Sequence, residues 1–235
     1  MGEIAFVKWL ESIFGIKAEP DYRKGPLTEF LPSDIKSVNG KPPKLNISIK
    51  TTKLRGIWLD IPYKQIEHSD VFILVRTGVT RWHFLAFLKK ISAIRDKILN
   101  KATKLGVITD NELKDIWDSI PDFTNVPAYI VGFFDKRVYG ADIKKQDSIF
   151  LVDGEMKIKR FVVNKFVGYW NPRQDKYKNK VIALLREQGK RIPDKAEIKF
   201  EGIDRFSPSL HFLVSSGVLK RRKPEWETII NQILS

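Results

Sequence analysis

Apolar residues near the N-terminus recur at the spacing of one face of an α-helix. The positions on this face are Ile4, Val7, Leu10, Ile13 and Phe14. Gly15 follows directly, and glycine commonly ends a helix because it adopts the left-handed conformation without a steric penalty. The pattern predicts an amphipathic helix that ends at Gly15, followed by a loop over residues 17–31, which contain Pro and Gly.

Two segments with the composition of β-strands, residues 33–38 and 45–51, flank the dipeptide Asn39-Gly40. Asn-Gly suits the positive φ angles of a tight hairpin turn. The two prolines that follow this dipeptide cannot donate to a strand ladder, so we expect pairing to begin near residue 45. These residues predict a β-hairpin.

The middle of the chain alternates strand-like and helix-like patterns. Unbroken apolar segments at residues 71–76 and 128–134 are typical of buried strands,. Between them, residues 82–105 have helical periodicity up to Gly106, which predicts one long helix. Residues 111–120 predict a shorter one.

The last third of the chain has a different pattern. Asp153-Gly154 lies between two strand-like segments, residues 148–152 and 157–163, and predicts a second hairpin,. The other expected elements are helices at residues 176–188, 208–216 and 225–234, and a basic strand or wing at residues 218–223. In order, all these elements predict an α/β fold, with a mixed central β-sheet flanked by helices and a basic helical C-terminal region.

Composition restricts the kinds of site that this chain of 235 residues can carry. It contains no cysteine, which excludes disulfide scaffolds, cysteine-based metal sites and thiol nucleophiles, and only three histidines,. A catalytic metal is therefore expected on oxygen ligands, which favours Mg²⁺ or Mn²⁺. No apolar segment approaches the length of about 20 residues that a membrane span needs. No secretory signal pattern opens the chain, so we expect a cytoplasmic protein with no membrane partner.

Positive charge is concentrated towards the C-terminus. The net charge is +14, and residues 157–235 contain 18 Lys and Arg against 8 Asp and Glu, which is +10 of that total. Clustered positive charge favours a polyanion such as nucleic acid as partner, although a lysine-rich solvated surface has the same composition. We therefore divide the chain into residues 1–165, a catalytic core, and residues 166–235, a basic recognition region.

The first predicted hairpin carries a candidate catalytic group. Residues two apart on a strand point to the same face, so Ser48 and Lys50 project together while Ile47 and Ile49 point into the core. The neighbouring strand is expected to place Asp34 beside them. A carboxylate next to a lysine suits metal-assisted phosphodiester hydrolysis, because one binds the cation and the other positions the attacking water.

Residues 33–52 resemble the active-site hairpin of the PD-(D/E)XK nuclease superfamily, especially its type II restriction endonucleases. The resemblance rests on Asp34, the Asn-Gly turn and the string Ile47-Ser48-Ile49-Lys50-Thr51-Thr52. Ser48 stands where the family usually has Glu or Asp. One group of these enzymes has Ser-x-Lys and takes the missing carboxylate from the following helix. The resemblance implies a restriction-endonuclease-like core.

On this resemblance, Glu67 is the expected second carboxylate, because it lies just before the apolar segment 71–76 and residues 62–66 suit the required helix. Asp34 and Glu67 would then bind the metal, Lys50 would act on the water, and Ser48 would support them by hydrogen bonding. Asp60 and Asp70 compete with Glu67, and accessory acids are expected among Glu3, Glu11 and Glu29. An alternative alignment uses Asp21 of Pro20-Asp21 in place of Asp34. We rank it second, because the segment that follows contains too many strand breakers.

Several planar or basic side chains are candidates for contact with DNA. They are Arg55, Trp170, Asn171, Arg173, Gln174, Lys176, Lys220, Arg221 and Arg222. Arg55 follows the lysine closely and suits a phosphate or a guanine edge, whereas the last three residues resemble the wing of a winged helix. Tryptophan is also a common core residue and basic residues also occur in solvated turns. His211 lies among apolar residues and is expected to be packed rather than a ligand.

These observations predict a type II restriction endonuclease that cleaves double-stranded DNA with Mg²⁺, or with Mn²⁺. As the resemblance implies, it would act as a homodimer on palindromic sites, since two-fold symmetry in the protein matches two-fold symmetry in the DNA. A structure-specific or repair endonuclease of the same superfamily is a second hypothesis. A non-catalytic DNA-binding protein is a third, and the absence of an acid at Ser48 favours it.

Overall fold

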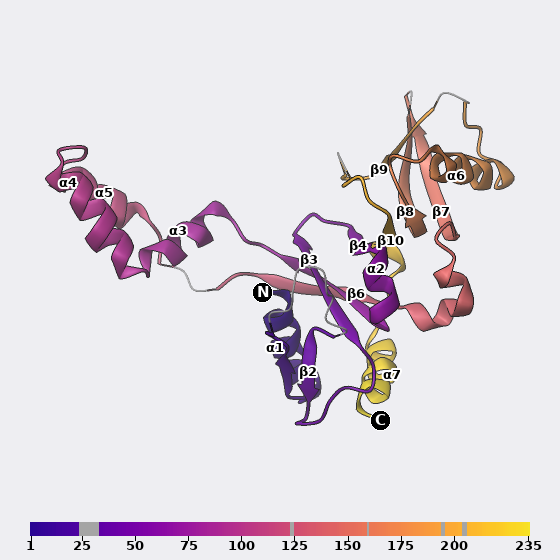
Figure 1. Cartoon of the computed structure of the whole chain (residues 1–235), viewed down its shortest axis with the longest axis horizontal. Helices are drawn as coiled ribbons and strands as arrows, with labels where there is room; N and C mark the ends of the chain where they lie inside the picture. The colour runs from indigo at the N-terminus through magenta and orange to yellow at the C-terminus, as the bar shows by residue number, and fades with distance from the viewer. Residues whose placement is uncertain (24–32, 123–124, 159, 194–195, 204–205) are drawn as a thin grey trace. The chain divides into compact units, whose positions relative to one another are not determined.

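The computed structural model describes residues 1–23, 33–122, 125–158, 160–193, 196–203 and 206–235, and it has a mixed α/β fold with several β-sheets flanked by helices (Figure 1). The chain forms two compact units. Unit 1 comprises Met1–Arg76 and Tyr129–Ser235, and unit 2 comprises Thr77–Ala128. Within the described residues, no helix has both the length and the apolar character needed to cross a membrane.

The first part of unit 1 contains the elements around the predicted hairpin. They are α1 (Gly2–Phe14), β1 (Ala18–Pro20), β2 (Ile35–Val38), β3 (Ile47–Lys53), β4 (Trp58–Pro62), α2 (Tyr63–His68) and β5 (Val71–Thr77). The first predicted helix is confirmed, because α1 ends at Gly15, which has φ 67° and donates its N–H to the carbonyl of Glu11. Part of the predicted loop, residues 24–31, lies outside the described residues.

The predicted hairpin is only partly correct. Asn39 and Gly40 form the turn with φ angles of 50° and 77°, and Val38 bridges Lys41. However, β2 pairs antiparallel with β1, and β3 pairs with β5 instead. The N–H of Asp34 donates to the carbonyl of Ile47 over 2.7 Å, which still holds the start of β2 beside β3. Pro42 and Pro43 interrupt the return strand and so prevent a continuous ladder.

The strand β5 is the buried central strand that its apolar sequence predicts. It lies between β3 and β6 (Ala128–Asp135) in a three-stranded sheet. Its side chains alternate between two hydrophobic cores, because successive residues of a strand point to opposite faces. Val71, Ile73 and Val75 enter one core, and Phe72 and Leu74 enter the other.

The first core joins the two ends of the chain. The last helix, α7 (Lys223–Leu234), packs here through buried residues that include Trp226. Its ring lies 4.7 Å from that of Trp9 and 6.1 Å from that of Phe6, both on α1. α1 and α7 therefore belong to one packed layer.

The second core surrounds a five-stranded mixed sheet. Its strands are β4, β7 (Ile149–Lys157), β8 (Arg160–Trp170), β9 (Glu197–Phe200) and β10 (His211–Ser215). The path runs β4-β10-β8-β7 with antiparallel pairing, and β9 joins β8 in parallel. The helix α6 (Asp175–Glu187) packs on this core through Tyr177, Val181 and Leu185. Two 3₁₀ segments complete unit 1, η2 (Lys136–Lys144) and η3 (Ser216–Val218).

Three predictions for the last third of the chain need correction. The strands of the second predicted hairpin do pair antiparallel, as β7 and β8, but Asp153-Gly154 is a bulge within β7 and not the turn, and the strand continues to Lys157. Residues 211–215, predicted as helix, form β10, because this short apolar segment is buried between β4 and β8. The expected wing is also absent from the described residues, since Lys220 forms an isolated bridge with Phe133 directly before α7. Residues 166–235 contain strands as well as helices, and the expected start of this region lies inside β8.

Unit 2 consists of short helices. They are α3 (Arg81–Lys89), the π-helix η1 (Ile94–Leu99), α4 (Asn100–Lys104) and α5 (Asp110–Ser119). The single long helix predicted for residues 82–105 is therefore interrupted after Lys89. The shorter predicted helix is confirmed as α5, which begins at a capping box between Thr109 and Glu112.

Candidate functional site

Asp34, Ser48, Lys50 and Gln65 form a connected hydrogen-bond network in unit 1. One carboxylate oxygen of Asp34, Oδ2, accepts the N–H of Ile49 at 2.5 Å and the hydroxyl of Ser48 at 3.3 Å. The side chain of Gln65 donates from Nε2 to Ser48 Oγ at 3.0 Å and accepts from the ammonium of Lys50 at Oε1. The structure thus brings together three of the four predicted catalytic residues, with Gln65 as an additional member.

The local folding of each element explains this convergence. Ser48 and Lys50 are two apart on β3 and share a face, as the sequence predicts, while the buried Ile47 and Ile49 flank them. Gln65 comes from α2, where it is buried beside Ile66. Because an ammonium can only donate, the amide oxygen of Gln65 must face Lys50, which leaves the amide nitrogen for Ser48.

Burial shifts the pKa values of both charged groups in this network. Burial raises the pKa of Asp34 above its usual value, and the nearby charge of Glu3 raises it too. The Ile49 N–H, the charge of Lys50 and the Ser48 hydroxyl oppose this change. Burial lowers the pKa of Lys50, while the negative charges of Asp34, Asp60 and Glu3 oppose that shift. Three carboxylates are therefore close enough to act on the Lys50 ammonium.

Glu3, one of the acids predicted as accessory, lies at the start of α1, and its charge acts on Lys50. The start of α1 lies directly against β3, since a Cβ placed at Gly2 would meet Oγ1 of Thr51 at 2.1 Å. Burial alone would raise the pKa of Glu3, but its own backbone N–H, the N-terminal ammonium and the charge of Lys50 lower it. Of the other accessory candidates, Glu11 is exposed on α1, and Glu29 lies outside the described residues.

Glu67 does not join the network. It is exposed on α2, two residues after Gln65, and at about 100° per residue the two side chains lie on nearly opposite faces of the helix,. Lys136 donates from Nζ to the carbonyls of Ile66 and Glu67 at 2.8 and 3.1 Å on that other side. Asp70, the other nearby acid, accepts the backbone N–H of Asn46 at 2.9 Å. The predicted metal ligand Glu67 is therefore replaced by a neutral amide at the position that faces Lys50.

Asp60 is held by a second polar cluster. Its Oδ1 lies 2.6 Å from Nδ1 of His211, whose Nε2 lies 2.7 Å from Oγ of Ser207 and 2.9 Å from Oγ of Ser209. His211 is buried, as the sequence predicts for a packed histidine. The cluster fixes the Asp60 carboxylate on β4, which follows β3 after a short turn.

Asp21, from the alternative alignment, has a different partner. Its carboxylate accepts hydrogen bonds from the side chain of Arg23 at 2.6–3.0 Å. Its backbone N–H donates to the carbonyl of Asp34 at 2.9 Å. Asp21 therefore lies next to Asp34 along the strand edge, but its carboxylate is engaged by Arg23 and not by Lys50.

The network fits a divalent cation that needs few protein ligands. Within the described ranges, no group of three or more His, Cys, Asp or Glu side chains is arranged to hold a metal. Mg²⁺ needs fewer, because it is usually bound by one or two carboxylates and keeps several waters. Both hydrogen bonds of the Asp34 carboxylate fall on Oδ2, so this carboxylate retains a second oxygen that the described contacts leave open.

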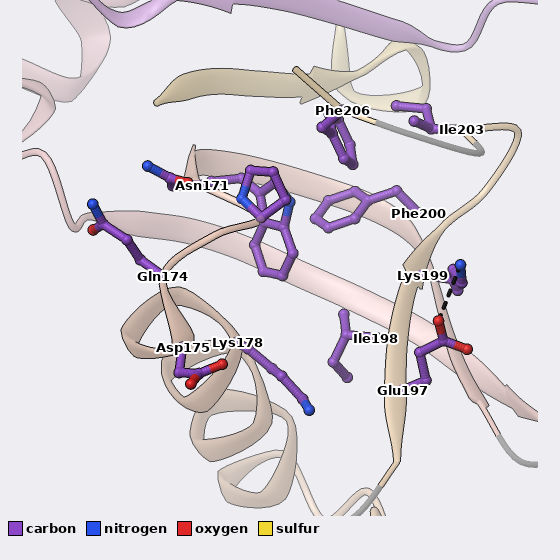
Figure 2. A pocket seen from close by; sticks show the side chains of 12 residues that line it. Asn171, Gln174, Asp175, Lys178, Glu197, Ile198, Lys199, Phe200, Ile203 and Phe206 are labelled. Carbon is purple, nitrogen blue, oxygen red and sulfur yellow. Dashed lines mark ion pairs between the residues drawn. The ribbon is translucent and has the colours of Figure 1, made fainter. Parts of the chain in front are cut away.

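The candidates for base recognition surround a pocket at the start of α6 (Figure 2). Trp170, Asn171 and Gln174 line it, whereas Arg173 and Lys176 are exposed nearby. Trp170 and Asn171 are buried, so their role is partly structural. The Asn171 carbonyl oxygen Oδ1 accepts the N–H of Arg173 at 3.0 Å and so shapes the turn into α6.

The remaining predicted DNA contacts lie elsewhere in unit 1. Arg55 is exposed in the turn between β3 and β4. Lys220, Arg221 and Arg222 are exposed before α7, where Glu225 accepts the N–H groups of both arginines at 2.8 Å. These basic residues are available at the surface but do not form one continuous element with those of α6.

Gln65 is the site residue that sequence reasoning missed. The search was for an acid on the helix after Ser-x-Lys, and Gln65 has the right place but not the right charge. Its position one residue before the buried Ile66 was the available signal. Comparison of the chain with protein-family models, curated proteins and solved structures gave no match.

Proposed function

We propose that this protein is a metal-dependent nuclease that acts on double-stranded DNA. Within that class, we propose a type II restriction endonuclease that uses Mg²⁺, or Mn²⁺, and acts as a homodimer. The observation that carries the proposal is a chain of hydrogen bonds between side chains. Lys50 donates to Gln65, Gln65 donates to Ser48, and Ser48 donates to Asp34. Glu3 and Asp60 add negative charge around the same lysine.

The chain's own residues have distinct roles in this proposal. Asp34 would hold the cation through its open carboxylate oxygen, together with Glu3, and Asp60 would be a third acid at the edge. When bound, the cation supplies electrostatic stabilisation of the charge that develops on the phosphate. Lys50 would position the attacking water by donating a hydrogen bond from its ammonium. Its lowered pKa makes the neutral amine, which can accept a proton from water, more accessible than in an exposed lysine,.

Gln65 and Ser48 act on the other residues rather than on the substrate. Gln65 holds the Lys50 ammonium from one side, and Ser48 donates to one oxygen of Asp34 and so restricts the rotation of this carboxylate. Interactions of this kind orient metal ligands, and their loss typically lowers activity by about 10- to 100-fold. In this arrangement, two neutral side chains replace the acid of the usual family pattern.

The test compares cleavage of a long duplex DNA with Mg²⁺ by the wild type and by four variants. Asp34→Ala and Lys50→Ala are expected to lower the cleavage rate by at least about 100-fold, because each removes a group that acts on the reacting phosphate or water. Gln65→Leu is expected to lower it by about 10- to 100-fold. Glu67→Gln is the matched control on the same helix and should leave the rate unchanged.

Gel analysis and end sequencing distinguish the alternatives. Discrete fragments with one common end sequence would support a restriction endonuclease, whereas cleavage confined to mismatched or branched duplexes would indicate a structure-specific enzyme. A strong loss with Glu67→Gln, and none with Gln65→Leu, would restore Glu67 as the second acid.

A non-catalytic DNA-binding protein is the second candidate function. It is favoured by the neutral side chains of Ser48 and Gln65 at positions where the family pattern requires a carboxylate. Intact DNA binding without cleavage under Mg²⁺ or Mn²⁺, in wild type and variants alike, would establish this candidate and overturn the nuclease.

A further inference from the structure

A pocket of about 350 Å³ lies between β9 and the start of α6, away from the elements that carry Asp34 and Lys50. Figure 2 shows Ile198 and Phe200 extending from β9 into this space, while Lys178 extends from the first turn of α6 towards β9. The volume is at the lower end of the range for small-molecule sites, which is about 300–1,000 Å³. The pocket is therefore suited to a single compact group.

One wall of the pocket is aromatic. The ring of Phe200 lies 4.8 Å from that of Trp170 and 5.2 Å from that of Phe206. The indole nitrogen of Trp170 is buried and has no hydrogen-bond partner among the residues that the structure describes. Flat rings of this kind stack on planar heterocycles, and stacking of one base on an aromatic side chain increases affinity by at least about fivefold.

The opposite wall of the pocket is polar. Gln174, Asp175 and Lys178 line the pocket, and none of their side-chain ends contacts another described residue through a hydrogen bond or ion pair. Together they offer a carboxylate acceptor, an ammonium donor and an amide that does both. By contrast, Glu197 and Lys199 on β9 neutralise each other over 3.0 Å.

We infer that this pocket binds one nucleobase turned out of the DNA duplex, stacked against the half-buried Phe206 and hydrogen-bonded by Asp175, Lys178 and Gln174. This inference rests on the proposed function for its choice of DNA as the ligand. A base attached to its strand needs cations outside the pocket for the flanking phosphates, and Arg173 and Lys176 are exposed there,. Asp175 accepts from an exocyclic amine, so the pocket favours adenine, cytosine or guanine over thymine.

The experiment measures binding of short duplexes with one extrahelical nucleotide, without divalent metal so that nothing is cut. The nucleotide carries a base in one set and is abasic in the other, and a fully paired duplex is included. An extrahelical base is already unpaired and unstacked, so binding it does not require the free energy of turning a base out of the duplex. Wild type is expected to bind the adenine or cytosine bulge at least about fivefold more tightly than the abasic bulge.

Two lysines of α6 form a matched pair of variants. Lys178→Ala should abolish most of the difference between base and abasic bulges, and Gln174→Ala should reduce it. Lys176→Ala removes the same charge outside the pocket, so it should weaken binding to both bulges equally and preserve their ratio. The Nζ of Lys176 lies 5.0 Å from the centre of the buried Tyr177 ring, so the stability of each variant is measured by thermal unfolding beside its binding.

Equal binding of base and abasic bulges by wild type would overturn the inference, as would an equal effect of Lys178→Ala and Lys176→Ala. These outcomes are independent of cleavage. If the protein binds the base bulge more tightly than the abasic bulge but never cuts DNA, the nuclease proposal is refuted and the base-binding pocket stands. If it cuts DNA but binds both bulges equally, the pocket is refuted and the nuclease proposal stands.

Discussion

Burial favours the neutral forms of both Asp34 and Lys50. The pKa of Asp34 is raised and that of Lys50 is lowered, with burial as the largest cause in each case. Burying a carboxylate and an ammonium lowers the stability of the folded protein. Such buried charged groups are typical of functional sites, because selection for stability alone would not keep them there. A bound cation would offset part of the cost at Asp34.

At the residue scale, this arrangement predicts how stability depends on pH. In the metal-free protein, the folded state holds the Asp34 proton at pH values where the unfolded chain, with a pKa of about 3.9, has released it. Stability therefore falls as pH rises from about 4 through the raised pKa of Asp34,. The stability of Asp34→Asn lacks this pH dependence, because an amide side chain does not titrate.

Denaturant unfolding of both proteins across this pH interval checks the prediction. The wild type should lose stability relative to Asp34→Asn as pH increases, and Mg²⁺ should restore stability in the wild type alone, because binding to the folded state stabilises it. Parallel pH profiles for the two proteins would contradict the raised pKa.

At the scale of elements, close backbone contacts determine where strands meet. Gly168 on β8 has φ 155°, and a Cβ there would lie 2.7 Å from both the Ile149 Cα and the Ser148 carbonyl oxygen. Neither atom belongs to a flexible side chain. The contact sits beside the irregular register at Ile149, where β7 begins. The β7–β8 ladder therefore depends on the absence of a side chain at this position.

Gly168→Ala is expected to lower the free energy of unfolding by about 2 kcal/mol or more, because strain and overpacking each cost about 1–3 kcal/mol. Gly217→Ala is the control, since a Cβ there meets nothing within 4 Å. Chemical denaturation of the three proteins measures the difference, and an equal effect of both substitutions would contradict the close contact.

Elements also differ in how well their local pattern predicts them. α1, α5, α6, α7 and β5 form at the expected places, because their periodicity, caps and apolar composition are local signals. Residues 211–215 form a strand although a helix was expected, since a short apolar segment suits either structure until its neighbours are known. β4 and β8 supply those neighbours.

At the scale of the whole molecule, unit 2 presents apolar side chains to solvent. Phe84 and Phe87, three apart on α3, are 59% and 61% exposed. Exposed apolar patches of this kind commonly mark contacts with another protein. The proposed homodimer provides a partner for them, because a second copy of the chain brings the same face.

The double substitution Phe84→Asp and Phe87→Asp is therefore expected to convert the dimer into a monomer. The molecular mass from light scattering should fall by half, while Lys101→Asp, an exposed change on α4, should leave it unaltered. A wild type that is monomeric at all concentrations would refute the dimer, and one whose mass the double substitution leaves unaltered would place its interface elsewhere.

The sequence by itself determined the features that depend on neighbouring residues. These include the amphipathic helices, the buried β5, the turn at Asn39-Gly40 and the shared face of Ser48 and Lys50, because strand and helix periodicity follow from backbone geometry. Only the tertiary structure decided that β2 pairs with β1, and that Gln65 instead of Glu67 faces Lys50. The rotation of α2 follows from burying Ile66 in the second core, and that contact joins residues far apart in the chain.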